Sequence, residues 1–220
     1  MKKVIIWLIT AVVLLVAGAS VMALSVIKYG PESYYADVET HKSDFEFDAP
    51  VTEINVNTVD GDVYILPSDS DVCHVSCIES DRQYNFVEMR DGVLSVTSHL
   101  ENRLEIDYLP FTEPPSVTIY IPSSEYNDLI INVTHGDVRI SNLVFDSIDI
   151  TAITGDVLFD MCDADEIVVN VTTGDVEGTL LSGKVFDAHT VTGDVDVPEN
   201  SDGGTCTVSL TTGDVSIDIA

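Results

Sequence analysis

Basic residues are scarce in this chain, and most of its length has almost none. Lysine and arginine number 9 against 38 aspartates and glutamates, for a formal net charge of −29. All of the acids but only six of the bases follow residue 28, so residues 29–220 carry 6 − 38 = −32. Such a surface repels phosphate backbones, which excludes nucleic acid as a partner. It favours divalent cations and cationic peptides, unless the charge only keeps a sheet-rich surface soluble.

Aromatic residues are also few, at 7% of the chain, although hydrophobic residues make up 45%. The hydrophobic content is enough for a packed core and argues against disorder. A core with few large rings must be filled by Val, Ile and Leu, which favour strands.

The chain has only four cysteines, and their spacing predicts neither a disulfide framework nor a zinc site. Cys73 and Cys77 lie four residues apart on one predicted strand. At about 3.3 Å per residue their Cα atoms are roughly 13 Å apart, which is too far for a disulfide. We expect these cysteines to be small thiols that fill the core.

Catalytic motifs are missing too. Residues 178–184 resemble a phosphate-binding loop, but Val185 stands where Ser or Thr is needed, so we interpret this stretch as a corner between strands. The five histidines show no ligand spacing. Carboxylates are so plentiful that pairs of them say nothing about glycosidase or lyase chemistry. We therefore predict no catalytic residue and no enzyme activity.

One long uncharged run is present at the N-terminus, from Val4 to Ile27. As a helix it would extend about 36 Å, enough to cross a membrane. Because Lys2 and Lys3 precede it, we expect residues 1–28 to be a transmembrane anchor with a cytoplasmic N-terminus. Residues 29–44 would be a stalk and residues 45–220 an extracytoplasmic domain. The alternative is a signal peptide cleaved near Ala19 or Ala23, which would release the rest by secretion.

The strongest signal is a repeat in the second half of the chain. The tetrapeptide Thr-Gly-Asp-Val occurs at residues 154–157, 173–176, 192–195 and 212–215. Residues 134–138 carry a variant with one extra residue, and the successive glycines are 19, 19, 19 and 20 residues apart. Apolar and polar residues alternate on both sides of each turn, as in strands.

Aligning the repeats places apolar residues in columns. These columns are Leu129, Ile148, Ile167, Phe186 and Cys206; Ile131, Ile150, Val169, Ala188 and Val208; Val138, Val157, Val176, Val195 and Val215; Ile140, Phe159, Gly178, Val197 and Ile217; and, on a third side, Leu143, Cys162 and Leu181. The columns predict an all-β fold, a parallel β-solenoid of coils of about 19 residues stacked roughly 4.8 Å apart. A sandwich of hairpins would explain the alternation but would not require matching columns.

The first half of the chain contains a weaker copy of the same pattern. Residues 53–65 include Asp60-Gly61-Asp62-Val63 between two alternating segments. Further strands are predicted at residues 71–78, 92–97 and 117–121, and a proline-containing loop at residues 102–115. We therefore expect residues 45–220 to be one continuous domain whose early coils are irregular.

The repeated turn suggests both a structural and a functional role for its aspartate. Glycine at a fixed turn position indicates a positive φ angle or close backbone packing, and the neighbouring aspartate can accept a bond from a nearby N–H. Stacking places one carboxylate column about 4.8 Å apart, where neighbours repel by about 0.9 kcal/mol in water; its members are Asp137, Asp156, Asp175, Asp194 and Asp214. Solvent, raised pKa values or bound cations could relieve the repulsion. If calcium does so, Asp175→Asn should weaken stabilisation by calcium.

The turns, the strand at residues 116–122 and the segment at residues 60–68 together resemble a bacterial family of unknown function, the putative-adhesin group with β-strand repeats. That group includes proteins of Lia-type cell-envelope stress systems. The resemblance covers about residues 45–220 and implies a β-solenoid on the outer face of a bacterial membrane. It implies no activity and no catalytic residues.

We therefore predict a non-enzymatic envelope protein, a binding or adhesin-like module that a membrane anchor presents to a protein or cationic peptide. The alternative is a self-assembling structural solenoid. Residues 217–220 end the chain without a cap, and an open coil exposes backbone groups that could pair with another copy.

Overall fold

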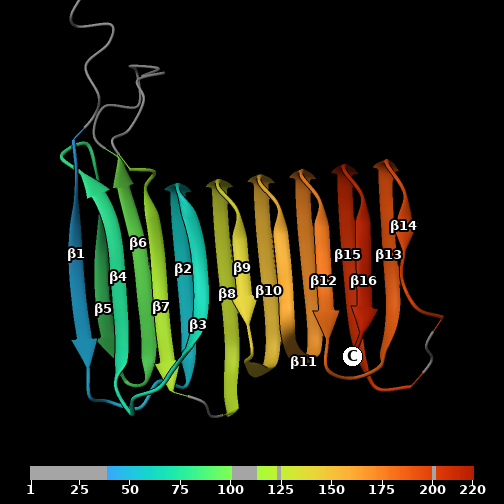
Figure 1. The fold of residues 1–220 in the computed structure, drawn as a ribbon, viewed down its shortest axis with the longest axis horizontal. Coiled ribbons are helices and arrows are strands. Elements are labelled where there is room, and N and C mark those ends of the chain that lie inside the picture. The colour runs from blue at the N-terminus through green and yellow to red at the C-terminus, as the bar shows by residue number, and fades with distance from the viewer. Residues whose placement is uncertain (1–38, 101–112, 123–124, 200–201) are drawn as a thin grey trace, which may run out of the picture. The chain divides into compact units, whose positions relative to one another are not determined.

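The computed structural model describes residues 39–100, 113–122, 125–199 and 202–220, and these residues form an all-β structure of sixteen strands (Figure 1). Among them there is no helix long and apolar enough to span a membrane. The predicted anchor at residues 1–28 lies outside the described residues. So does most of the predicted stalk, but the first strand already begins at Thr40.

Six repeat units make up most of the fold, and each consists of a strand, a Gly-Asp turn and a second strand. We number them in chain order: unit 1, β2 Glu53–Asp60 and β3 Asp62–Ser68; unit 2, β8 Glu125–His135 and β9 Val138–Ser141; units 3 and 4, β10 Val144–Thr154, β11 Val157–Thr173 (shared) and β12 Val176–Leu180; unit 5, β13 Lys184–Thr192 and β14 Val195–Asp196; unit 6, β15 Gly204–Thr212 and β16 Val215–Ile219.

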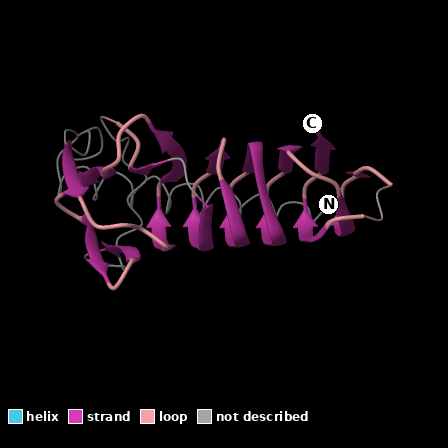
Figure 2. Cartoon of the chain, turned by 90° about the horizontal axis from the view of Figure 1, so that it is seen from below, coloured by secondary structure: helices cyan, strands magenta, loops and turns pink. Residues whose placement is uncertain are grey.

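The units stack by parallel pairing, with like residues side by side. Ile148 lies beside Leu129 on one side and Ile167 on the other, and Val157 lies between Val138 and Val176. The first strands of the units form one row and the second strands a facing row (Figure 2). The predicted columns are therefore present along units 2, 3 and 4.

The order of the stack differs from the order of the chain at its end. Unit 6, not unit 5, pairs with unit 4. In this pairing Ile167 lies beside Cys206, and Gly178 lies beside Ile217. Unit 5 pairs only with unit 6, through β13 with β15 and β14 with β16. The prediction that the C-terminal coil ends the stack is thus wrong, since unit 5 lies beyond unit 6. Strand β16 pairs with β12 along its length, but with β14 only at Val215 and Ser216.

The interleaved order has identifiable local causes. A short link, residues 181–183, carries the chain past the place of unit 6, and the chain returns to it between β14 and β15. The returning chain passes so close to earlier backbone that a Cβ on Gly203 would lie 2.0 Å from the Gly183 oxygen, and one on Gly204 2.2 Å from the Asp165 oxygen. Only glycine permits these approaches.

A mixed group of strands covers the other end of the stack: β1 Thr40–Phe47, β4 Cys73–Ser80, β5 Gln83–Arg90, β6 Val93–Leu100 and β7 Ser116–Pro122. Strands β6 and β7 continue the parallel pairing onto unit 1, whereas β1, β4 and β5 pair antiparallel. The early part of the domain thus combines one regular unit with parallel and antiparallel neighbours.

The core lies between the two rows of strands and is aliphatic, as the composition predicted. Ile54, Leu129, Ile148 and Ile167 are each at most 1% exposed. Burial of one such side chain contributes about 1.5–3 kcal/mol. Leu181 does not fit the predicted third side, because it lies in the short link and is 42% exposed.

Candidate functional site: the aspartate ladder and its flanking surfaces

The Gly-Asp turns stack directly on one another, and their glycines touch. Gly155 and Gly174 have φ angles of 141° and 145°, a region that residues with a side chain rarely adopt. A Cβ added to Gly174 would lie 2.0 Å from the Gly155 oxygen. The sequence predicted a positive φ or close packing, and the turn needs glycine for both reasons.

Each turn joins its neighbour through backbone hydrogen bonds that run in one direction. The Gly174 N–H donates to the Thr212 oxygen at 3.1 Å, and the Val176 N–H donates to the Asp214 oxygen at 2.9 Å. The same two bonds link units 1 to 2, 2 to 3, 3 to 4 and 6 to 5. These two bonds use the N–H groups of the turn glycine and valine, so the N–H of the aspartate between them needs another acceptor.

The aspartate side chain supplies that acceptor. In each turn after the first, the aspartate N–H donates to Oδ1 of the aspartate in the preceding unit of the stack, at 2.7–2.9 Å. We call this array the aspartate ladder, and its spatial order is Asp62, Asp137, Asp156, Asp175, Asp214 and Asp194. A hydrogen bond to an ionised acceptor is stronger than a neutral one, so the ladder stabilises every unit junction it crosses.

The ladder contains all five predicted aspartates and adds Asp62, which sequence reasoning left out. The signal for Asp62 was present in Asp60-Gly61-Asp62-Val63. The predicted turn cap is formed, but it acts between units rather than within one. The N–H donors offset part of the repulsion along the column. Among the described residues, no three His, Cys, Asp or Glu side chains are arranged to hold a metal ion, and calcium binding by the ladder stays a prediction.

The first strands of the units carry no acidic side chain on the outward side of the part nearest the turns. We call this part the neutral face; its two columns of outward residues are Asn57, Asn132, Thr151, Asn170, Ser209 and His189, and Val59, Thr134, Ile153, Thr172, Thr211 and Val191. Farther from the turns, Asp149 and Glu166 face outward on the same strands, so the neutral face ends there. A shallow groove of about 380 Å³ crosses its last four units. Twelve adjacent positions without a carboxylate stand out, because residues 29–220 carry a net charge of −32.

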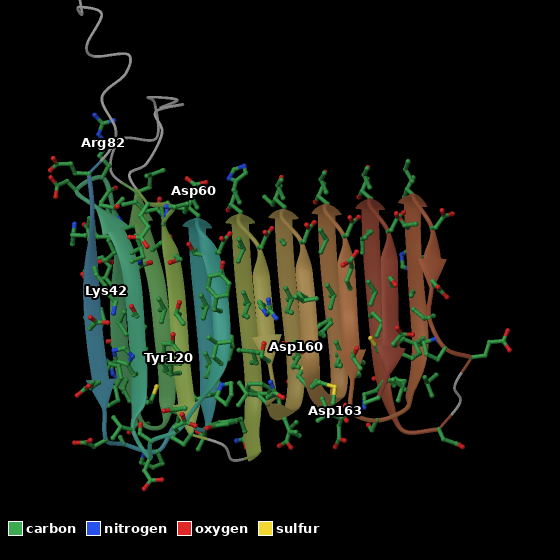
Figure 3. The ribbon with its side chains drawn as sticks, in the orientation of Figure 1. Lys42, Asp60, Arg82, Tyr120, Asp160 and Asp163 are labelled. Atoms are coloured by element: carbon green, nitrogen blue, oxygen red, sulfur yellow. The ribbon has the colours of Figure 1, made fainter. Side chains whose placement is uncertain are left out.

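The surface on the other side of the ladder is acidic. A groove of about 280 Å³ there is lined by ladder carboxylates, Tyr64, Arg139 and Glu177. Arg139 pairs with Asp160 at 3.0 Å (Asp160 is labelled in Figure 3). Burial and the nearby Asp62 raise the pKa of Tyr64, which donates a hydrogen bond to that carboxylate at 3.1 Å. These groups can bind cations and donors, and they lack the nucleophile–base pair that acyl transfer needs.

The four cysteines are free and buried, which confirms their prediction as core thiols. Burial raises the pKa of Cys73 to about 11 and that of Cys162 to about 12. Such thiols are poor nucleophiles because the thiolate is scarce.

The loop that resembles a phosphate site is a corner of the stack, as predicted. Lys184 is only 3% exposed in its side chain, and its Nζ lies 2.5 Å from Asp163 Oδ1 and 2.7 Å from Ser182 Oγ. Asp163 lies near the bottom corner of β11 (Figure 3). This pair ties unit 5 to β11 across unit 6, so the lysine has a structural role.

Comparison with known proteins relates this architecture to bacterial proteins. A family model described as Toastrack DUF4097 matches residues 51–143 and again residues 125–220. No curated protein matches the chain. A structure described as a “putative cell adhesion protein” from Clostridium sporogenes is similar over 82% of this chain and 100% of its own, with 14% identity and a TM-score of 0.63. A “putative adhesin” from Bacteroides fragilis covers 82% of this chain and 97% of its own at 14% identity, with a TM-score of 0.34.

Proposed function

Since this chain belongs to the Toastrack DUF4097 family, we propose that it is a non-enzymatic, extracytoplasmic binding module that captures cationic polypeptides. Its N-terminal segment holds the module at the membrane, and its repeats form a β-solenoid of about 19-residue coils. The description of a structural relative as an adhesion protein supports a binding role.

The observation that carries the proposal is the distribution of charge. Residues 29–220 hold 38 acids and six bases, and two of those bases, Arg139 and Lys184, are already paired with aspartates. The ladder adds a column of carboxylates in which each bonded aspartate uses Oδ1 for the next turn. Such an array attracts polycations over about a Debye length, roughly 8–10 Å, and the attraction weakens with salt.

The test is binding of a labelled decalysine peptide to the full-length protein in an uncharged detergent, followed by fluorescence anisotropy. We expect saturable binding that weakens at least tenfold between about 50 and 500 mM salt. Decaglutamate and a Gly-Ser peptide of equal length are the controls. Equal binding of all three peptides, or none of decalysine, would contradict the proposal.

Self-association is the second candidate function, and one observation favours it. The outer edge of unit 5 is paired with no other described strand, and unpaired edges are templates for another chain. Light scattering of the full-length protein tests it: a mass that rises with concentration supports assembly, and a constant mass contradicts it. The unpaired edge includes β13 and, in β16, residues 217–219, which do not pair with β14.

A further inference from the structure

The stack of repeat units ends at a sheet edge that no described strand covers. Strand β13 pairs only with β15, and β14 only with β16. Both lie at the far end of the stack from β1 (Figure 1). At the other end, the stack continues into the strands that cover unit 1.

The core is partly open at this edge. Phe186 and Ala188 are half-buried, whereas their neighbours in unit 6, Cys206 and Val208, are 0% exposed. Val195 is 41% exposed, and its neighbour Val215 is fully buried. The same columns are buried in the units that have neighbours on both sides, so a strand added at this edge would cover these side chains.

The turn of unit 5 offers groups that every other turn uses. In unit 6, the Gly213 and Val215 N–H groups each donate to unit 5 at 2.9 Å. The matching N–H groups of Gly193 and Val195 find no acceptor among the described residues, and the Asp194 carboxylate accepts no N–H from them. Asp194 is therefore the last rung of the ladder.

We propose that this edge takes an extended, basic segment of a partner polypeptide, which adds one strand to β13. The inference rests on the proposed function and specifies its site. Charge selects the occupant: Asp187, Asp194 and Asp196 are exposed here, while Lys184 is buried against Asp163. A second copy would bring these same acids against each other, and like charges on paired strands destabilise.

The bound segment is recognised in the way that strand addition requires. Its backbone pairs with β13, its alternate apolar side chains cover Phe186 and Ala188, and its basic side chains face Asp187 on the outer side. One donor of the segment meets Asp194. The chemistry predicts a sequence that alternates apolar and basic residues and contains no proline, because proline cannot donate to the ladder of backbone bonds.

The experiment uses the full-length protein in uncharged detergent and the nonapeptide (Lys-Val)4-Lys, with anisotropy as the readout. The matched probe carries N-methyl groups on its valines, which keeps the charge but removes N–H donors. The matched variants are Asp194→Lys at the edge and Asp149→Lys on an exposed interior position. We expect the N-methylated probe and Asp194→Lys each to weaken binding at least tenfold, and Asp149→Lys to change it less than threefold.

The outcomes separate this site from the proposed function. Equal losses in both variants, or equal binding of both probes, would overturn strand addition at β13 while leaving capture of cationic peptides intact. Absence of binding to the nonapeptide and to decalysine would overturn both. A doubled mass without peptide, reverted by Asp194→Lys, would assign the edge to a second copy and overturn the basic occupant.

Discussion

Asp156 shows how one residue type can stabilise a stack that its charge would otherwise weaken. Its Oδ1 accepts the Asp175 N–H at 2.8 Å, and its own N–H donates to Asp137 Oδ1 at 2.8 Å. The side chain thereby satisfies the one turn N–H that the backbone pattern leaves over. Both bonds lie at exposed turns, so each contributes the net value of about 0.5–1.5 kcal/mol, which offsets the roughly 0.9 kcal/mol of repulsion between neighbouring carboxylates in water.

Replacing one rung tests this balance. Asp156→Ala should lower the free energy of unfolding by about 1–2 kcal/mol, because the Asp175 N–H loses its acceptor. Asp156→Asn should cost less than about 0.5 kcal/mol, because the amide oxygen still accepts. Asp194→Ala is the control, since no described residue donates to that carboxylate. Urea unfolding measures all three; an equal loss in Asp156→Ala and Asp194→Ala would contradict the ladder.

The turn glycines make a sharper demand, because both conformation and space exclude a side chain. Gly174→Ala should destabilise by more than about 3 kcal/mol, since a positive φ costs about 1–3 kcal/mol and the Cβ meets backbone. Gly92 also has a positive φ, of 86°, but a Cβ added there would approach the movable Thr52 side chain, at 2.7 Å. Gly92→Ala should therefore lower the free energy of unfolding much less than Gly174→Ala. Similar urea midpoints for the two variants would show that close stacking does not matter.

The buried thiols predict a loss of stability in alkali. Burial raises the pKa of Cys77 to about 12 in the folded protein, whereas an unfolded thiol titrates near 8.5–9. The contribution of the protonated thiol to the free energy of unfolding is complete below about pH 9. It is lost as the pH rises toward 12, by about 1.4 kcal/mol per pH unit for each thiol. Urea midpoints at pH 8 and 10.5 should therefore fall less steeply in Cys77→Ala. A slope unchanged by that substitution would exclude the thiol as a cause.

At the scale of elements, the pattern of residues predicted more of the repeats than of their order. The Gly-Asp turns and alternating segments predicted strands on both sides of each turn in units 1 to 6, and parallel pairing follows in the structure. The order of units 5 and 6 could not be predicted, because every unit presents the same turn groups and similar apolar columns. Contacts outside the repeat, such as Lys184 with Asp163 and the approach at Gly203, are consistent only with the interleaved order.

In the first half of the chain, too, the sequence predicted only some of the strands and not their pairing. Strands β1 and β5 were not predicted, because their alternation is not tied to a Gly-Asp turn. Their antiparallel pairing depends on partners distant in sequence, as β1 with β4. The ladder was predicted as a column of carboxylates, but the N–H groups that bind them could be found only from the register.

Engineered disulfides test the interleaved order directly. Asn170 and Ser209 are neighbours across units 4 and 6, about 4.8 Å apart as parallel partners, and both side chains face outward. Asn170→Cys with Ser209→Cys should form a disulfide readily. Asn170→Cys with His189→Cys should not, because unit 6 lies between and the distance is about 9.6 Å. Non-reducing mass spectrometry distinguishes the pairs, and the reverse result would restore the chain order.

At the scale of the whole molecule, the described domain separates its surfaces by charge. The neutral face groups twelve positions without a carboxylate beside the ladder. The acids of the repeats lie on the ladder, on the facing row of strands, at the open edge and farther from the turns on the first strands, as Asp149 and Glu166 do. Long-range attraction brings a polycation to the domain, and the unpaired edge of β13 adds a directional contact. The two effects predict different stoichiometries. Attraction alone gives binding at many positions on the surface, whereas the edge gives one binding site per chain.

Calorimetry of the full-length protein with (Lys-Val)4-Lys at about 50 mM salt tests whether this module captures cationic polypeptides at one edge. We expect saturable binding with one peptide per chain, lost at about 500 mM salt. The absence of any saturable binding at low salt, or a stoichiometry of many peptides per chain with no preferred site, would contradict it.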